Sequence, residues 1–251
     1  MDFNELAERV DTAAKNASAI SQLSSTTSFS VDESYEIQRL AIDRRLDRGE
    51  KLIGLKMGFT SEAKMKQMGV HDMIWGRLTN AMMVDEQFDL AAHIHPRAEP
   101  EICFRVNRDI NTELTIEECK QVVDAVAPAI EVIDSRYENF KFSLEDVIAD
   151  NCSSAGIILG EWLSPGLPLG DLGMNLEIDG EVVEQGNSNA ILGNPWKSLA
   201  AATRLAAQYD QPIAAGSIIM AGASTPAVFL KANQRVKLTV DTLGTAEFVV
   251  G

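Results

Sequence analysis

Residues 95–135 have the sequence HPRAEPEICFRVNRDINTELTIEECKQVVDAVAPAIEVIDS, which predicts a strand, a helix and a second strand. The first strand, PEICFRV (100–106), alternates in polarity, as a strand does when one of its faces is buried. Thr115, followed three residues later by a glutamate, has the signature of a helical capping box, and Pro128 ends the predicted helix. AIEVIDS (129–135) then follows as a buried strand.

The N-terminal part of the chain is predicted to be helical. Residues 3–19 and DESYEIQRLAIDRRLDRG (32–49) contain many good helix formers, and a Ser/Thr-rich turn at 21–30 joins them. The pattern then changes to short strands separated by glycines, beginning with KLIGLKMGF (51–59). A short helix is expected over SEAKMKQMGV, closed by Gly69.

The C-terminal half is predicted to add a hairpin, a helix and three strands. In MNLEIDGEVVEQG, the pair Asp179 and Gly180 suits the type I′ turn of a β-hairpin. Asn194 followed by Pro195 is the favoured order for the start of a helix, an N-cap and then a proline. GSIIMAG, RVKLTV and AEFVV are expected to be further strands.

Length and composition suit a globular enzyme. A chain of 251 residues and 27.3 kDa, of which 45% are hydrophobic, can bury a substantial core. We predict one α+β catalytic domain over residues 1–251. It would comprise a helical N-terminal segment (1–50) and a mostly antiparallel or mixed sheet with inserted helices (51–251).

Charge and cysteine usage narrow the class of protein. The net charge of −15 argues against a nucleic-acid partner, which needs a cluster of Lys and Arg. No apolar run reaches the roughly 18–20 residues that span a bilayer, and the acidic N-terminus differs from a signal peptide. We interpret Cys103, Cys119 and Cys152, which lack metal-type spacing, as reduced core thiols of a cytoplasmic protein.

Three glutamates carry the strongest chemical signal. Glu99 and Glu101 lie two apart on a strand, so they share a face, where two carboxylates repel unless a proton or cation neutralises them. A solvated strand edge is the alternative. Glu131, however, lies inside the apolar sequence Ala-Ile-Glu-Val-Ile, so either Arg136 or a metal must pair with it. Three carboxylates suit Mg²⁺, with Mn²⁺ also possible.

Two further segments place polar residues in an apolar setting. Lys56 lies in the glycine-flanked strand IGLKMGF, where it either extends outward to solvent or belongs to a site. In ADNCSSAG, Ser153 and Ser154 precede a strand, and they either form a turn or offer hydroxyl groups to a ligand. The pattern alone leaves both alternatives open.

Several ordered blocks of the chain resemble the 2-keto-4-pentenoate hydratase and 4-oxalocrotonate decarboxylase family, within the fumarylacetoacetate hydrolase superfamily. The resemblance covers almost the whole chain, from the second helix to the C-terminal strands. Its blocks are IGLKMGFTSEAKMKQMGV, IWGRLTNAM, HPRAEPEICF, AIEVIDSRYENFKF, DVIADNCSSAGIILG and GTAEFVV.

The resemblance implies a mixed β-sandwich roll of the fumarylacetoacetate hydrolase C-terminal-domain type, assembled as a homo-oligomer. It implies that Glu99, Glu101 and Glu131 hold a divalent metal, usually Mg²⁺, and that Lys56 belongs to the active site. The family commonly has aspartate where this chain has Asn80. An asparagine cannot transfer a proton there, although its amide could orient water or substrate.

The blocks IWGRLTNAM and SRYENFKF look more like the decarboxylase branch of the family. The implied reaction is metal-dependent decarboxylation of 2-oxohex-3-enedioate (4-oxalocrotonate) to 2-hydroxypenta-2,4-dienoate, in the catabolism of aromatic compounds. We expect Arg136, Ser153 and Ser154 to bind this small 2-oxo acid. Arg77, Arg136 and Lys141 are the candidate partners of its far carboxylate.

Two other functions are compatible with the same resemblance. The first is hydration of 2-hydroxypenta-2,4-dienoate to 4-hydroxy-2-oxopentanoate, which would use the same metal but add water at the far end. The second is a non-catalytic partner subunit, because decarboxylases and hydratases of the family are often found together in complexes. The retained glutamates and Lys56 argue against a silent subunit, which would not need them.

Overall fold

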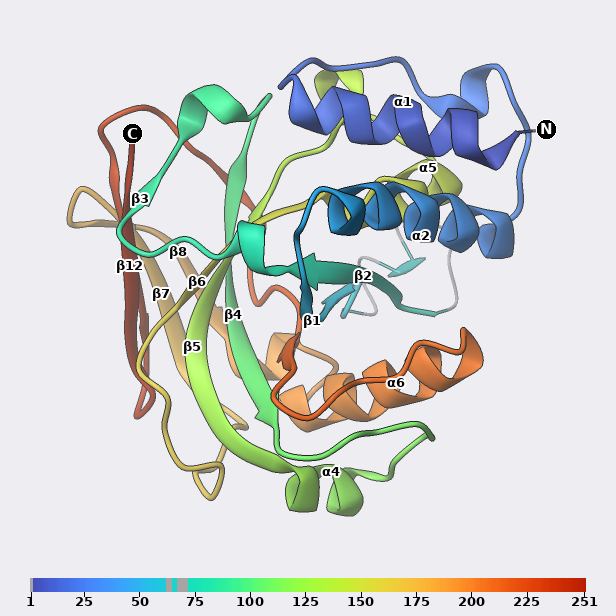
Figure 1. Ribbon diagram of the computed structural model, residues 1–251. Coiled ribbons are helices and arrows are strands. Elements are labelled where there is room, and N and C mark those ends of the chain that lie inside the picture. Colours follow the sequence, from blue (N-terminus) through green and yellow to red (C-terminus); the bar gives the residue numbers. More distant parts are fainter. Residues whose placement is uncertain (1, 62–64, 67–71) are drawn as a thin grey trace.

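The computed structural model describes residues 2–61, 65–66 and 72–251 (Figure 1). Its strands are β1 (Leu52–Gly58), β2 (Ile74–Thr79), β3 (Gln87–Phe88), β4 (Arg97–Val106), β5 (Val123–Ile133), β6 (Ser154–Leu159), β7 (Gly173–Ile178), β8 (Glu181–Asn187), β9 (Ile218–Met220), β10 (Val228–Phe229), β11 (Arg235–Val240) and β12 (Gly244–Val250). Its helices are α1 (Phe3–Lys15), α2 (Val31–Asp47), α4 (Ile116–Val122), α5 (Leu144–Ala149) and α6 (Pro195–Gln208).

The described strands form two mixed sheets. One has the order β2-β1-β9-β4-β5-β6, with β10 beside β4, and the other has the order β3-β12-β11-β7-β8. Strand β1 is parallel to β9, and β12 is parallel to β3, whereas the other paired strands are antiparallel. This architecture confirms the predicted α+β fold with mixed sheets.

The first sheet rolls up, so that its two end strands approach each other. Strand β2 contacts β6, and after β2 the backbone N–H of Val84 donates to the carbonyl of Ile157 over 2.9 Å. Sheets twist in one direction, and a strongly twisted sheet curls toward closure. Side chains from β1 and β5, which are not neighbours in the sheet, therefore face each other across the inside of the roll.

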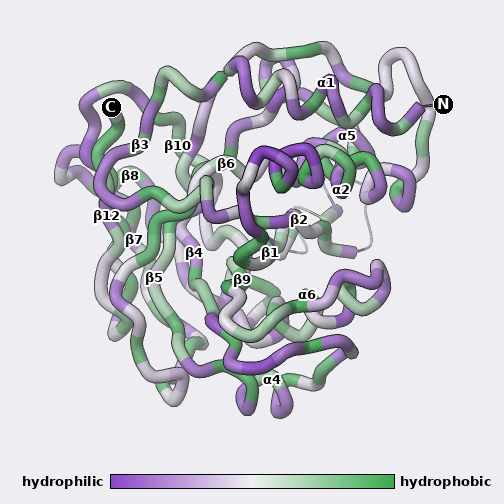
Figure 2. Tube along the Cα trace, in the orientation of Figure 1, coloured by the Kyte–Doolittle hydropathy of each residue, from purple (hydrophilic) through white to green (hydrophobic). Residues whose placement is uncertain are grey.

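The long central strands β4 and β5, which are curved in Figure 1, are buried on both faces. Their even-numbered residues, such as Ile102 and Ile130, belong to the main hydrophobic core, together with Leu238 and Phe248 of the second sheet. Figure 2 shows this concentration of hydrophobic residues along β5. Since successive side chains alternate across a strand, the odd-numbered residues point into the roll. That face carries the predicted glutamates.

The N-terminal helices pack on the outer side of this roll. Helix α1 packs on α2, and α2 on α5, around a smaller core that includes Leu6, Ile37 and Tyr137. Gln38 of α2 donates to the carbonyl of Trp75 on β2 (3.1 Å) and to that of Ile148 on α5 (2.8 Å). A buried side-chain amide thus connects the helical segment to the sheet.

Local sequence signals predicted several elements correctly. Asp179 and Gly180 have φ values of +54° and +85°, as the turn of the hairpin between β7 and β8 requires. The side chain of Asn194 accepts a hydrogen bond from the backbone of Trp196, which makes it the N-cap of α6. The capping box of Thr115 at the start of α4 is also present.

The predicted end of that helix at Pro128 is wrong. Helix α4 ends at Val122, and β5 begins at Val123 and continues through Pro128. The carbonyl of Pro128 accepts a hydrogen bond from Gly160, so its nitrogen faces the same edge of β5, beyond the end of β6 at Leu159. The missing N–H of Pro128 therefore falls at the end of the β5–β6 ladder, and proline is tolerated in a strand at such a position.

Other differences concern short or irregular elements. The first helix ends at Lys15 rather than at residue 19. The sequence analysis did not predict β2 or α5 as separate elements. The helix expected over SEAKMKQMGV lies mostly outside the described residues. No helix within the described ranges is long and apolar enough to cross a membrane.

The packing between the two sheets predicts how the chain responds to a core truncation. Ile130 is fully buried between them, so Ile130→Ala should lower the free energy of unfolding by about 2–5 kcal/mol. Leu52→Ala is the control, because Leu52 is 41% exposed, and we expect a change of no more than about 0.5 kcal/mol. Urea denaturation measures both. Equal effects in the two variants would contradict the assigned core.

Candidate functional site

Three carboxylates meet on the inner face of the rolled sheet. In the antiparallel register of β4 and β5, Glu99 lies directly opposite Glu131, and Glu101 lies opposite Ala129. One carboxylate oxygen from each glutamate lies within 4.8 Å of the others, and all three residues are buried. The structure therefore brings together the three predicted metal ligands. Like charges placed directly opposite each other destabilise a sheet unless a proton or a cation neutralises them.

Neighbouring groups orient two of these carboxylates. Ser154 Oγ donates to Oε1 of Glu131 over 2.9 Å, and the backbone N–H of Gly222 donates to Oε2 of Glu101 over 2.7 Å. Gly222 has φ +104°, and a Cβ there would lie 2.1 Å from Oγ1 of Thr60, so only glycine presents this N–H. The segment after β9 thus fixes Glu101.

Lys56 supplies a positive charge from the opposite wall of the roll. Its Nζ lies 3.1 Å from Oε2 of Glu131, as an ion pair outside hydrogen-bond geometry, and it donates to the carbonyl of Cys152 over 3.0 Å. Burial alone would lower the pKa of Lys56, but the nearby carboxylates, Glu131 first, raise it above its usual value. Lys56 is therefore a charged, buried lysine. The sequence left Arg136 or a metal as the partner of Glu131, and in the structure Lys56 forms the ion pair instead of Arg136.

The carboxylates fit a divalent cation. Burial, followed by the charge of Glu131, raises the pKa of Glu101 well above its usual range, and burial also raises the pKa of Glu131 against the effect of Lys56. Oε1 of Glu101 is buried without a hydrogen-bond partner among the described residues. Either protons or a metal cation can relieve the repulsion between carboxylates placed in this way. Hard oxygen ligands of this kind and number suit Mg²⁺ or Mn²⁺.

A left-handed turn between α5 and β6 holds Lys56 in place. Asn151, Cys152 and Ser153 have φ values of +50°, +51° and +60°, which are uncommon for residues other than glycine. The side chain of Asn151 replaces a strand partner, because it accepts from the N–H of Arg77 (2.7 Å) and donates to its carbonyl (2.8 Å). This turn presents the carbonyl of Cys152 to Lys56. The strained backbone therefore supports the site.

The carboxylates lie beside a cavity of about 350 Å³. Glu99, Lys56 and Ser153 line it, together with apolar and aromatic side chains and one arginine, Arg97. The predicted substrate contact of Ser153 is compatible with this position. The other lining residues are Gly58, Phe59, Ile74, Ile133, Phe140, Phe142, Val147, Cys152, Pro226 and Ala227.

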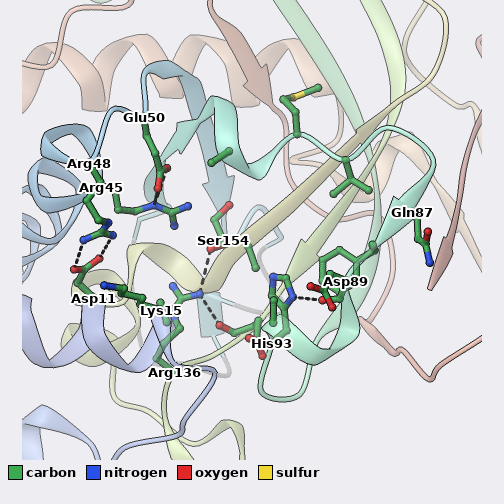
Figure 3. Close-up of a pocket in the computed structure, with 18 of the residues that line it drawn as sticks. Asp11, Lys15, Arg45, Arg48, Glu50, Gln87, Asp89, His93, Arg136 and Ser154 are labelled. Atoms are coloured by element: carbon green, nitrogen blue, oxygen red, sulfur yellow. Dashed lines mark hydrogen bonds and ion pairs between the residues drawn. The ribbon is translucent and has the colours of Figure 1, made fainter. Parts of the chain in front are cut away.

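A larger cavity of about 630 Å³ lies beside the N-terminal helices (Figure 3). Several of its charged groups are already paired: Arg48 with Asp11 over 2.6 Å, and Arg45 with Glu50 over 2.9 Å. Ser154 lines this second cavity and not the first, and its hydroxyl is committed to Glu131. The structure thus shows Ser154 orienting a predicted metal ligand, and its predicted contact with substrate stays a prediction.

Arg136 also lines the larger cavity, where Figure 3 shows its guanidinium directed at protein groups. Its Nε and Nη2 donate to the carboxylate and the carbonyl of Asp150, and its Nη1 donates to the carbonyls of Asp134 (2.6 Å) and Ser154 (3.1 Å). Burial raises the pKa of Asp150 to about 6, and Arg136 opposes this. These contacts give Arg136 a structural role and lend no support to its predicted contact with substrate.

The remaining predicted residues lie away from the carboxylates. Asn80 is exposed, and its Oδ1 accepts from the backbone of Lys51 over 2.6 Å, so its catalytic role stays a prediction without support from this geometry. Arg77 is buried against α2, where it donates to Gln38 over 2.7 Å. Lys141 is exposed and does not line the cavity.

The metal assignment makes a direct prediction. Glu101→Gln keeps the shape of the side chain and removes one negative ligand, so the affinity for Mn²⁺ should fall more than about tenfold. Glu113→Gln changes an exposed glutamate outside the cluster and should leave the affinity unchanged. Isothermal titration calorimetry measures both. Equal Mn²⁺ affinity in the Glu101 variant and the wild type would rule out this cluster as the metal site.

Comparison with known proteins agrees with this fold. The family model for the fumarylacetoacetate (FAA) hydrolase C-terminal region matches residues 56–251. A protein of Pseudomonas sp. named 4-oxalocrotonate decarboxylase is 50% identical over 250 residues, which cover 99% of this chain and 98% of that protein. A 2-keto-4-pentenoate hydratase of Paraburkholderia xenovorans (strain LB400) is 33% identical, with 96% and 92% covered.

A solved structure is also similar along nearly the whole chain. The 4-oxalocrotonate decarboxylase from Pseudomonas putida G7, complexed with magnesium and adipate, superimposes with a TM-score of 0.95 at 35% identity. The match covers 99% of this chain and 97% of the other. The chain therefore belongs to the fumarylacetoacetate hydrolase family, in its branch of 4-oxalocrotonate decarboxylases and 2-keto-4-pentenoate hydratases.

Proposed function

We propose that this chain catalyses the divalent-metal-dependent decarboxylation of 2-oxohex-3-enedioate to 2-hydroxypenta-2,4-dienoate, a step in the catabolism of aromatic compounds. The observation that carries the proposal is the cluster of three buried carboxylates and Lys56 beside one cavity. The relatives named 4-oxalocrotonate decarboxylase, and the solved one that holds magnesium and the dicarboxylate adipate, support it.

The reaction breaks the bond between C5 and C6 of the substrate. The electron pair of that bond moves through the conjugated chain to the 2-oxo oxygen, C6 leaves as CO₂, and a proton is taken up to give the 2-hydroxydiene. A divalent cation, when bound, supplies a Lewis acid for the oxygens of the 2-oxo acid. The protein has to hold that cation, orient the conjugated chain and stabilise the negative charge that develops on the 2-oxo oxygen.

Lys56 and the carboxylates have different roles in this reaction. Glu99, Glu101 and Glu131 would hold the cation, while Ser154 and the N–H of Gly222 fix two of the three. An ammonium group has three N–H donors. Lys56 donates to the carbonyl of Cys152, forms an ion pair with Glu131 and lines the cavity, so a donor is left for a ligand there. We infer that the donor toward the cavity stabilises the developing charge on the substrate oxygen.

The apolar walls of the cavity strengthen this electrostatic effect. Phe59, Ile74, Ile133, Phe142 and Val147 line the space where a conjugated carbon chain would lie. Apolar walls exclude water, and charge interactions are stronger where water is excluded. The cavity volume of about 350 Å³ lies at the lower end of the usual range for small-molecule sites, which suits a six-carbon acid.

Hydration of 2-hydroxypenta-2,4-dienoate is the second candidate, and the relatives named 2-keto-4-pentenoate hydratase favour it. The same carboxylates and Lys56 would serve both reactions, since both place negative charge on the same oxygen. They differ in whether the distal end of the cavity binds a carboxylate or admits water. A non-catalytic partner subunit would not need a buried lysine and three buried glutamates, whose burial is costly.

Assembly and location form part of the same proposal. We infer a homo-oligomer, and a complex with a related hydratase, because Val182, Val183 and Phe229 leave large apolar side chains 41–53% exposed. Three buried, unpaired cysteines support a reducing compartment such as the cytoplasm. The bonds from Gln38 to the sheet support a single catalytic domain over residues 1–251.

An assay with 2-oxohex-3-enedioate tests the proposed reaction. With Mg²⁺, absorbance change and CO₂ release should occur together, and EDTA should abolish both because it removes the cation. Turnover of 2-hydroxypenta-2,4-dienoate without CO₂ release would make the chain a hydratase instead. Inactivity toward both compounds would refute both enzyme assignments.

Substitution of Lys56 tests its role. Lys56→Met keeps the length of the side chain and removes the charge, so kcat should fall by about 100-fold or more. Glu131→Gln should also lose activity while the chain stays folded, as circular dichroism would show. Lys51→Met changes an exposed lysine at the start of the same strand and serves as the control. Full activity of the Lys56 and Glu131 variants would refute the assigned site.

A further inference from the structure

Arg97 lies on the same strand face as the carboxylate cluster. It is the first residue of β4, two residues before Glu99 and four before Glu101, so all three side chains point into the roll. Two residues of a strand advance roughly 6.6 Å. Arg97 therefore lies one such step further toward one end of the cavity that it lines together with Glu99.

Two aromatic rings hold its guanidinium. The guanidinium carbon lies 3.9 Å from the ring centre of Phe140 and 4.0 Å from that of Phe229. Phe229 is the cross-strand partner of Arg97 on β10, and it is 53% exposed, which places this end of the cavity at the surface. Stacking between two rings fixes the plane of a guanidinium while it leaves the N–H donors at the edge accessible.

The donors of Arg97 lack the protein acceptors that other arginines have. Arg136, Arg77 and Arg105 donate to carboxylate, carbonyl or amide oxygens. Arg97 has no ion pair among the described residues, and its Nε is buried without a hydrogen-bond partner there. Burial lowers the pKa of Arg97, and Glu99 opposes this, but a guanidinium stays protonated at neutral pH. Arg97 is therefore a cation in the wall of the cavity, without an ion-paired anion among the described residues.

We propose that Arg97 binds the distal carboxylate of the substrate and selects a dicarboxylic 2-oxo acid over a monocarboxylic one. This inference rests on the proposed function. An extended six-carbon chain spans roughly 6 Å between its terminal carbons. A 2-oxo acid held at the glutamates by one end would thus place its other end one strand step away, beside Arg97. A planar guanidinium matches a carboxylate with two parallel hydrogen bonds.

The chemistry of the reaction predicts how this contact affects the kinetics. The distal carboxylate leaves as neutral CO₂, so its charge decreases toward the transition state. A contact with Arg97 therefore stabilises bound substrate at least as much as the transition state. Loss of Arg97 should raise KM about 10- to 100-fold for the dicarboxylate and should leave kcat unchanged or higher.

The binding test uses two unreactive ligands that differ only at the distal end. 2-Oxohexanedioate and 2-oxohexanoate share the 2-oxo acid group, and both lack the double bond that decarboxylation needs. Calorimetry on the Mg²⁺-loaded protein should show that the wild type prefers the dicarboxylate about 10- to 100-fold. Arg97→Met should reduce that preference to near unity and leave the affinity for 2-oxohexanoate unchanged.

Arg105→Met is the matched control. Arg105 lies on the same strand, pairs with Asp124 over 2.9 Å and stacks on Trp162, but it does not line the cavity. Its loss should not change the ligand preference. Arg97→Gln, which removes the charge and keeps a polar group, repeats the test if the methionine variant does not fold.

Each outcome separates this inference from the proposed function. A wild type that prefers the dicarboxylate, with the preference intact in both Arg97 variants, would overturn the role of Arg97 and leave the decarboxylase proposal standing. A wild type without any preference would overturn both. An equal loss of affinity for the two ligands in the Arg97 variants would make Arg97 a structural clamp between Phe140 and Phe229, and would also overturn the inference.

Discussion

The buried pairing of Glu99 opposite Glu131, next to Glu101, is the constraint on which the site depends. Antiparallel strands place these side chains where like charges repel, and burial removes the water that would screen them. Lys56 reaches Glu131 only because the sheet rolls and brings β1 across from β5. A divalent cation bound by the three carboxylates would reduce their repulsion further. The rolled sheet, which brings Lys56 to Glu131, and the cation therefore both reduce the repulsion between the carboxylates.

The cavity beside this cluster has two chemically different ends. At the inner end lie the carboxylates and Lys56, and at the outer end a guanidinium lies between two rings, with apolar walls along the space between. The inner end can serve any 2-oxo acid, because it contacts the part that all of them share. Discrimination between substrates must then come from the outer end, where their chains differ.

Sequence patterns predicted the structural features that depend only on neighbouring residues along the chain. Strand periodicity placed Glu99 and Glu101 on one face, and the apolar surroundings of Glu131 indicated that a charge there needs a partner. The direct opposition of Glu99 and Glu131 depends on register, which single-strand patterns do not contain. Pro128 misled the prediction because its effect depends on which edge of β5 still has a neighbour.

Arg136 and Arg97 show that the prediction of functional residues from sequence has the same limit. Each is the single arginine of a block that carries the family resemblance, so sequence offers no way to rank them. The fold gives each nitrogen of the Arg136 guanidinium a protein acceptor and leaves Arg97 stacked but without an ion pair among the described residues. On the proposed function, this chain would discriminate between dicarboxylic and monocarboxylic 2-oxo acids around Arg97, Phe140 and Phe229 rather than at the metal.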